Sequence, residues 1–170
     1  MAKFSNITKF TIGNYEVDVH VRLLIDVLKS YDQDYVLELN PDFQRGNVWT
    51  EEQQIAYLEF FLKGGRSARV IYFNIGEWSD DPNTDIPHMV CVDGLQRLTA
   101  FIRFLNNEIP VFGSYYREYE DKLNDTIKFN INNLAYKKDV LKWYIEMNSG
   151  GTVHSKEELE RVKAMIDEYK

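Results

Sequence analysis

The sequence has few of the residues on which disulfide-bonded, zinc-binding or membrane proteins depend. Cys91 is the single cysteine among 170 residues, so no internal disulfide can form, which fits a reducing cytoplasm. The three histidines lie far apart in the sequence without metal-ligand spacing, which argues against a zinc site. No run approaches the roughly 20 apolar residues that span a bilayer, and residues 1–11 lack a signal-peptide pattern. We therefore expect a cytoplasmic protein without membrane contact.

Basic residues are also scarce. Lysine and arginine number 20 against 27 aspartates and glutamates, which gives a net charge of −7. This balance argues against a protein that coats DNA, because phosphate contacts require dense positive charge, but it leaves room for a local basic pocket. No linker, repeat or low-complexity segment interrupts the chain. We expect one domain over residues 1–170, with residues 1–8 as a flexible tail.

Neither a Walker-type loop nor a serine nucleophile elbow is present. Hydrophobic periodicity instead predicts mixed secondary structure, of the α/β or α+β class. Helices are expected over residues 19–31, 50–62, 95–106, 138–147 and from 156 toward 169. Strands are expected over 35–39, 69–75, 89–92 (continuously apolar, hence buried on both faces) and 126–131 (at a sheet edge). Helix starts are indicated by Asp18 as an N-cap and by two capping boxes, Thr50 with Gln53 and Ser155 with Glu158. Residues 111–125 show no clear period.

The most informative segment is the junction Asp93-Gly94-Leu95-Gln96-Arg97. A buried strand ends there, turns at a glycine and starts a helix, whose first turn offers free N–H groups and positive partial charge to an anion. Arg97 in that turn opposes the helix dipole at a cost of about 0.3–1 kcal/mol, and a bound phosphate would reverse the sign of this effect. The alternative is a purely structural turn, with Asp93 and Gln96 capping the helix and Arg97 in solvent.

Two further segments carry residues suited to binding phosphates. In the polar loop over residues 40–49, Arg45 could clamp a phosphate and either Phe43 or Trp49 could stack on a base. Paired glycines after Asn148 could arrange N–H groups as an anion-binding nest. The alternatives are a loop pinned by its aromatics and a glycine turn that ends a helix.

Taken together and in this order, the three segments resemble the N-terminal domain family of GmrSD-type restriction enzymes, within the ParB/sulfiredoxin-like superfamily. The resemblance covers about residues 19–162. It implies an α+β fold with a ParB/sulfiredoxin-like core, a small mixed sheet flanked by several helices, and a pocket for a nucleoside triphosphate. The implied nucleotide-binding residues are Gln44, Gly94, Gln96, Asn148, Gly150 and Gly151. The implied catalytic residues are Asp93, Arg97 and Arg45, and Asp93 is also the candidate Mg²⁺ ligand.

The chain departs from the family pattern in two ways. Leu95 replaces a second glutamine of the motif, and no His-Asn-His nuclease motif follows, so we expect the nucleotide-handling module alone. The sulfiredoxin cysteine is also missing. The expected function is nucleoside-triphosphate binding and hydrolysis with Mg²⁺, linked to DNA restriction, phage defence or counter-defence in a bacterial cell. Two alternatives stay open: a ParB-like DNA nuclease, and a non-catalytic module, bacterial or phage-encoded, that binds a nuclease or defence protein.

Overall fold

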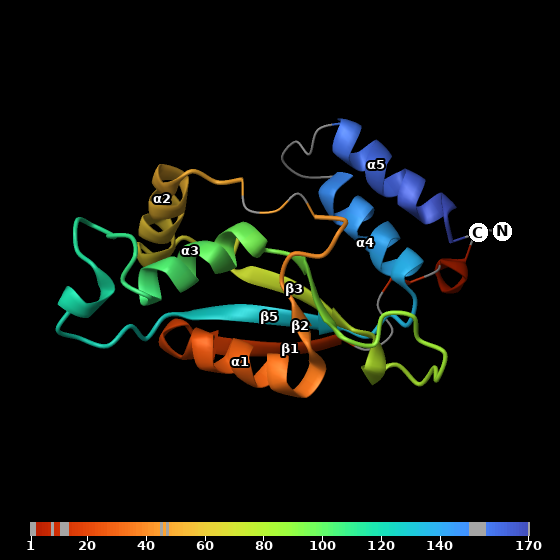
Figure 1. Ribbon diagram of the computed structural model, residues 1–170, viewed down its shortest axis with the longest axis horizontal. Helices are drawn as coiled ribbons and strands as arrows, with labels where there is room; N and C mark the ends of the chain where they lie inside the picture. Colours follow the sequence, from red (N-terminus) through yellow and green to blue (C-terminus); the bar gives the residue numbers. More distant parts are fainter. Residues whose placement is uncertain are drawn as a thin grey trace.

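The computed structural model describes residues 3–7, 9–10, 14–44, 46, 48–149 and 156–169, which form one mixed sheet covered by helices (Figure 1). The strands are β1 (Asn14–His20), β2 (Leu37–Glu38), β3 (Val70–Ile75), β4 (Met89–Asp93) and β5 (Thr126–Asn132). The α-helices are α1 (Leu24–Tyr35), α2 (Glu51–Leu62), α3 (Leu95–Leu105), α4 (Lys137–Ser149) and α5 (Lys156–Asp167). Short 3₁₀ helices are η1 (Phe4–Asn6), η2 (Val21–Leu23), η3 (Gly76–Trp78) and η4 (Tyr116–Glu118).

The sheet has the strand order β1-β5-β3-β4-β2. The pairs β1–β5 and β3–β4 are antiparallel, whereas β3–β5 and β2–β4 are parallel. This mixed sheet with flanking helices confirms the expected α+β class.

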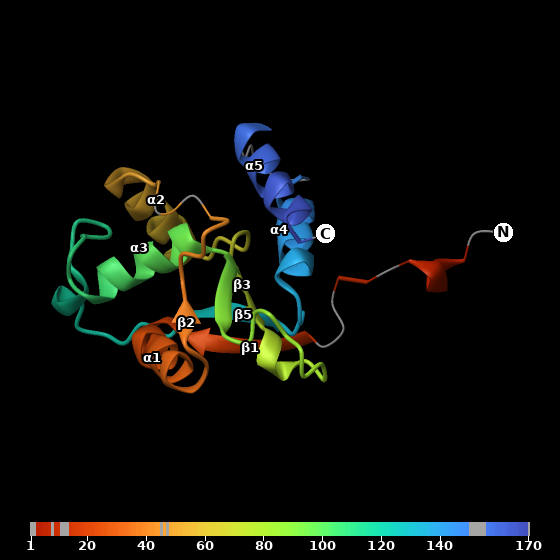
Figure 2. The same ribbon diagram turned by 45° about the vertical axis from the view of Figure 1, so that its right-hand side comes forward.

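Each face of the sheet has its own hydrophobic core. Helices α1, α2 and α3 lie on one side and α4 and α5 on the other (Figure 2). Strand β4 contributes side chains to both cores, because successive side chains point to opposite faces of the sheet. Met89 and Cys91 belong to the first core, and Val90 and Val92 belong to the second. All four are fully buried, which confirms the prediction from the apolar run.

Two sequence predictions about the outer strands were wrong. Residues 14–20 form β1, so the first α-helix begins only at Leu24, after η2, and Asp18 lies in a strand rather than at an N-cap. In β1 the side chains alternate in burial, with Val19 buried between exposed neighbours, which is a period of two rather than 3.6. Strand β5, predicted at an edge, lies between β1 and β3 because β1 covers its outer side.

Unlike the Asp18 signal, the capping box predicted at the start of α2 is present in the structure. At α2 the Thr50 hydroxyl accepts a hydrogen bond from the Gln53 amide (3.3 Å), and the Gln53 side chain accepts one from the Thr50 amide (2.9 Å). This confirms the first capping box. In the second box Ser155 lies outside the described residues, and Glu158 accepts a hydrogen bond from the Tyr144 hydroxyl on α4 (3.1 Å).

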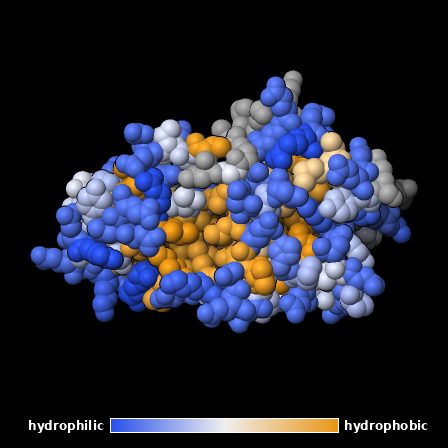
Figure 3. All heavy atoms as spheres, viewed as in Figure 1, coloured by the Kyte–Doolittle hydropathy of each residue, from blue (hydrophilic) through white to orange (hydrophobic). Residues whose placement is uncertain are grey.

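One face of the molecule carries an apolar groove. Figure 3 shows apolar side chains gathered in a hollow between α1 and α3. A groove of about 290 Å³ lies there, lined mainly by Ile25, Leu28, Leu37, Leu39 and Ile102.

Among the helices of the described ranges, none has the length and apolar composition needed to cross a membrane.

Candidate functional site

The candidate site is built on the tight turn between β4 and α3. Strand β4 ends at Asp93, Gly94 is the N-cap of α3 with φ +118°, and the helix begins at Leu95. A Cβ on Gly94 would lie 2.7 Å from Cδ1 and 2.9 Å from Cγ2 of Ile71 on β3. Both the positive φ and this close approach require glycine.

The first turn of α3 has no side-chain cap. Gly94 offers no side chain to the leading N–H groups, and the first backbone hydrogen bond of the helix runs from the Leu98 amide to the Gly94 carbonyl (2.9 Å). The amides of residues 95–97 therefore precede the helical hydrogen-bond ladder, where an anion is favoured by both hydrogen bonding and the helix dipole.

Arg97 folds back over the end of the sheet and away from bulk water. Its Nη2 donates to Oδ2 of Asp93, one turn earlier, and its Nη1 donates to the Val70 carbonyl on β3 (2.7 Å). The Arg97 side chain is 14% exposed and that of Asp93 37%. The charge that opposes the helix dipole is thus balanced within the chain, and a guanidinium and a carboxylate stand together at the start of α3.

Gln96 fixes the neighbouring loop over residues 41–49. Its Oε1 accepts hydrogen bonds from the amides of Val48 (2.9 Å) and Trp49 (3.0 Å), and its Nε2 donates to the Gly46 carbonyl. The structure thereby gives Gln96 a positioning role, in addition to the nucleotide contact that was predicted and that stays a prediction.

The same loop is held from other directions. Gln44 donates through Nε2 to the Cys91 carbonyl on β4 (2.5 Å). Arg161 on α5 donates to the carbonyls of Asp42 (2.9 Å) and Phe43 (3.0 Å), and Lys137 on α4 pairs with the Asp42 carboxylate (2.6 Å). The loop therefore connects the start of α3 to the two C-terminal helices.

These segments surround a cavity of about 350 Å³. Its described lining is Gln44, Trp49, Ala68, Asp93, Gly94, Leu95, Gln96, Arg97, Tyr144 and Asn148. Six of the nine predicted site residues thus meet at one cavity; the other three, Arg45, Gly150 and Gly151, lie outside the described residues. The Nδ2 of Asn148 donates a hydrogen bond to the Tyr144 carbonyl (2.7 Å), so the Oδ1 of Asn148 can accept a hydrogen bond from another donor.

The structure separates the two aromatic residues proposed to stack on a base. Trp49 lines the cavity, with its ring centroid 5.4 Å from that of Tyr57. Phe43 is fully buried and packs edge-on against Tyr144 (5.4 Å between centroids), so it belongs to the core and the prediction for it was wrong. Tyr144 and Ala68 line the cavity without having been predicted. Nothing in the sequence around either residue indicates a site.

Burial shapes the titration of two groups beside the cavity. Burial, together with the nearby negative charge of Asp93, raises the pKa of the Cys91 thiol to about 12. Cys91 is therefore a protonated core residue rather than a nucleophile. Burial also raises the pKa of Tyr57 to about 12, against the opposing positive charges of Arg97 and Arg69.

The described lining of the cavity can hold a metal ion only if a bound nucleotide supplies some of the coordinating oxygens. No group of three or more His, Cys, Asp or Glu side chains that could hold an ion occurs in the described part of the chain. Asp93 is the single carboxylate among the described lining residues. One or two carboxylates, with substrate phosphates and water, is the usual donor set for Mg²⁺ at nucleotide sites, so Asp93 fits Mg²⁺ that enters with a nucleotide.

Residues 24–164 match the model of the N-terminal domain of the GmrSD restriction endonuclease. The chain belongs to this family. No curated protein and no solved structure matches it significantly. The family membership confirms the resemblance indicated by the three motifs. The matched range spans the positions of all nine predicted site residues, whose roles stay predictions. The membership places the GmrSD N-terminal domain described here in a restriction-related family.

Proposed function

We propose that this GmrSD N-terminal domain binds a nucleoside triphosphate with Mg²⁺ in the cavity at the start of α3 and hydrolyses its phosphoanhydride. The observation that carries the proposal is the uncapped first turn of α3, which opens beside Arg97 into a cavity of about 350 Å³. This volume is within the usual range for small-molecule sites.

Each described side chain then has a chemical task. The amides of residues 95–97 and the Arg97 guanidinium hold phosphate oxygens, and Arg97 stabilises the charge that spreads over them in the transition state. Asp93 would hold the Mg²⁺, which offsets phosphate charge when bound, or orient the attacking water. Trp49 is suited to stack on the base, and Gln96 keeps Trp49 in place through its amide.

The family membership adds a biological setting. In a restriction-related protein, nucleotide binding in this domain would license the action of a nuclease on DNA. The tie from the 41–49 loop to α4 and α5, through Lys137 and Arg161, offers a physical connection from the cavity to the surface of the C-terminal helices.

The test is nucleotide binding by calorimetry and phosphate release by the purified chain, with and without Mg²⁺. Arg97→Ala removes a charge-assisted contact worth roughly 1.5–3 kcal/mol, so affinity should fall at least about tenfold. Asp93→Asn keeps the shape and should abolish Mg²⁺-dependent release. Arg117→Ala, which removes an exposed guanidinium from a segment outside the cavity, is the matched control and should behave as wild type. Equal turnover by the wild type and both site variants refutes the proposal.

A second candidate is a nucleotide sensor that binds without turnover. The observation in its favour is the pairing of Asp93 with Arg97, which occupies both charged groups that hydrolysis requires. The same assays separate the two candidates: a sensor binds the triphosphate, loses affinity in Arg97→Ala and releases no phosphate above the control.

A further inference from the structure

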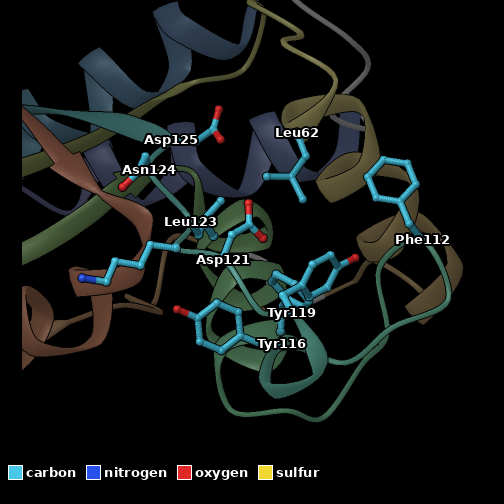
Figure 4. A pocket seen from close by; sticks show the side chains of 10 residues that line it. Leu62, Phe112, Tyr116, Tyr119, Asp121, Leu123, Asn124 and Asp125 are labelled. Carbon is cyan, nitrogen blue, oxygen red and sulfur yellow. The ribbon is translucent and has the colours of Figure 1, made fainter.

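A second cavity lies at the opposite end of α3. It measures about 390 Å³, and we name it the aromatic pocket. Its lining is Leu62, Phe104, Phe112, Tyr116, Tyr119, Asp121, Lys122, Leu123, Asn124 and Asp125. Figure 4 shows the Asp121 carboxylate projecting among these side chains, near the rings of Tyr116 and Tyr119. None of these residues belongs to the nucleotide site, so the aromatic pocket needs a separate explanation.

Specific hydrogen bonds and ring contacts hold the pocket together, although most of the segment over residues 107–125 has no regular secondary structure. The Tyr119 hydroxyl donates to the Val111 carbonyl (2.6 Å), and the Phe112 amide donates to Oε1 of Glu59 on α2 (3.1 Å). The rings of Tyr116 and Tyr119 pack edge-on against Phe104, with centroids 5.4 Å and 6.1 Å away. Specific contacts thus hold the aromatic walls in place.

Two aromatic rings remain available at the rim. Phe112 is 48% exposed and Tyr119 37%. Phe112 also adopts a φ of +49°, which is an outlier for a bulky side chain and sets its ring at the edge of the pocket. The Lys63 ammonium lies 5.3 Å from the centroid of the Phe112 ring, so this ring already attracts a cation.

The electrostatics of the pocket favour positive charge. Between residues 107 and 125 five acidic side chains outnumber two basic ones. Two helices also end at the pocket, α2 at Leu62 and α3 at Leu105, and helix C-termini carry negative partial charge. The pKa of Tyr119 is raised, first by burial and then by the negative charges of Glu59, Asp121 and Glu118. The negative charge that favours a cation in the pocket thus also acts on this tyrosine.

We propose that the aromatic pocket is a docking site for an arginine-bearing basic segment of a partner protein. Arginine fits because its planar guanidinium stacks on aromatic faces while its N–H groups pair with carboxylates. The carboxylate of Asp121 is available for this pairing: no partner contacts it in the part of the chain that the structure describes. Asp125 already forms an ion pair with Arg69 (3.9 Å), so Asp121 is the carboxylate that meets the incoming guanidinium. The same carboxylates repel nucleic-acid phosphates, which makes a protein the fitting partner.

The test uses the full chain and two synthetic peptides, acetyl-Gly-Arg-Gly-Arg-Gly-amide and its citrulline counterpart. Citrulline keeps the shape of arginine without its charge. In NMR titrations the arginine peptide should shift the ring resonances of Phe112, Tyr116 and Tyr119, and the citrulline peptide should not. Asp121→Asn should weaken binding about threefold or more, and Lys122→Gln should strengthen it, because the two changes move the charge of the pocket in opposite directions.

The proposal is overturned if the arginine peptide leaves these rings unshifted, if citrulline binds equally well, or if Asp121→Asn has no effect. It is also overturned if a single-stranded oligonucleotide shifts the same rings, because the occupant would then be a polyanion. Thermal unfolding of each variant at the wild-type temperature verifies that an altered titration reflects binding rather than folding. The exposure of Asp121 and Lys122 makes this outcome expected.

Discussion

Replacing Gly94 by alanine should separate two reasons for a glycine at the start of α3. The first is conformational: a φ of +118° lies where residues with a Cβ are strained, at a cost of about 1–2 kcal/mol. The second is steric: the new Cβ would stand 2.7 Å and 2.9 Å from two carbon atoms of Ile71, and overpacking of this kind costs about 1–3 kcal/mol. Together they predict that Gly94→Ala lowers the free energy of unfolding by roughly 2–5 kcal/mol.

The chain supplies controls for the conformational part. Gly64 (φ +88°) and Gly113 (φ +79°) also have left-handed backbone conformations, but no heavy atom lies within 4 Å of a Cβ at either position. Gly64→Ala and Gly113→Ala should therefore cost only about 1–2 kcal/mol. The assay is urea unfolding followed by tryptophan fluorescence, with the slope checked for each variant.

A double variant isolates the steric part. Ile71→Val deletes Cδ1, the atom nearest the new Cβ, so Gly94→Ala should be less costly in the Ile71→Val background. Contacting residues typically show coupling of about 0.5–3 kcal/mol in such a cycle. If Gly94→Ala costs no more than Gly64→Ala, or if the cycle shows no coupling, the close approach of α3 to β3 does not explain the glycine.

Three other predictions concern groups around the same cavity. Gln96→Leu removes three hydrogen bonds to the 41–49 loop, so hydrogen exchange of the loop amides should accelerate and stability should fall by about 2–4 kcal/mol at roughly 1 kcal/mol per bond; unchanged exchange would contradict this. Thr50→Ala removes one half of a capping box and should cost about 1 kcal/mol in urea unfolding, with Thr50→Ser near wild type. The pKa values of Cys91 and Tyr57 are raised in the folded state, so the unfolded chain loses these two protons at lower pH than the folded chain does. The free energy of unfolding should therefore have its full value below about pH 8.5 and fall as the pH rises toward 12. Tyr57→Phe should flatten the upper part of this fall, and a profile that is flat to pH 12 in the wild type would contradict the burial of both groups.

The β4–α3 junction could be predicted from sequence because each local signal pointed to the same structure. A continuously apolar strand, a glycine and a helical apolar stripe follow one another within residues 89–105, and each feature is present where expected. The three motifs also indicated one site, and the structure brings their described members together. What the sequence did not indicate is Tyr144, which lines the cavity from α4 beside the predicted Asn148 as a result of tertiary packing.

The failures of sequence-based prediction have physical causes as well. The sequence pattern does not reveal β1, because Val19, its last apolar residue, is followed by Val21, Leu24 and Leu28. The spacing of these residues also fits the apolar side of one long helix. Strand β5 lies inside the sheet rather than at the predicted edge because β1, which the sequence pattern does not reveal, covers its outer side. The aromatic pocket gave no signal because side chain–backbone hydrogen bonds, such as that from Tyr119 to Val111, organise residues 107–125 without a periodic pattern.

The position of Arg97 shows why a residue pattern alone does not establish a ligand. A cation at a helix start suggested a missing anion, and the structure supplies one from the same chain, the Asp93 carboxylate. Arg97 can then leave Asp93 only for another anion, and Asp93 can release Arg97 only for another cation, because an unpaired charge at this partly buried turn is costly. A triphosphate accompanied by Mg²⁺ satisfies both conditions at once, whereas a free triphosphate satisfies only one. The wild type should therefore lose most of its nucleotide affinity when EDTA is added, and Asp93→Asn, which already frees Arg97, should lose much less. Equal sensitivity to EDTA in both would mean that the Asp93–Arg97 pair stays closed and takes no part in binding.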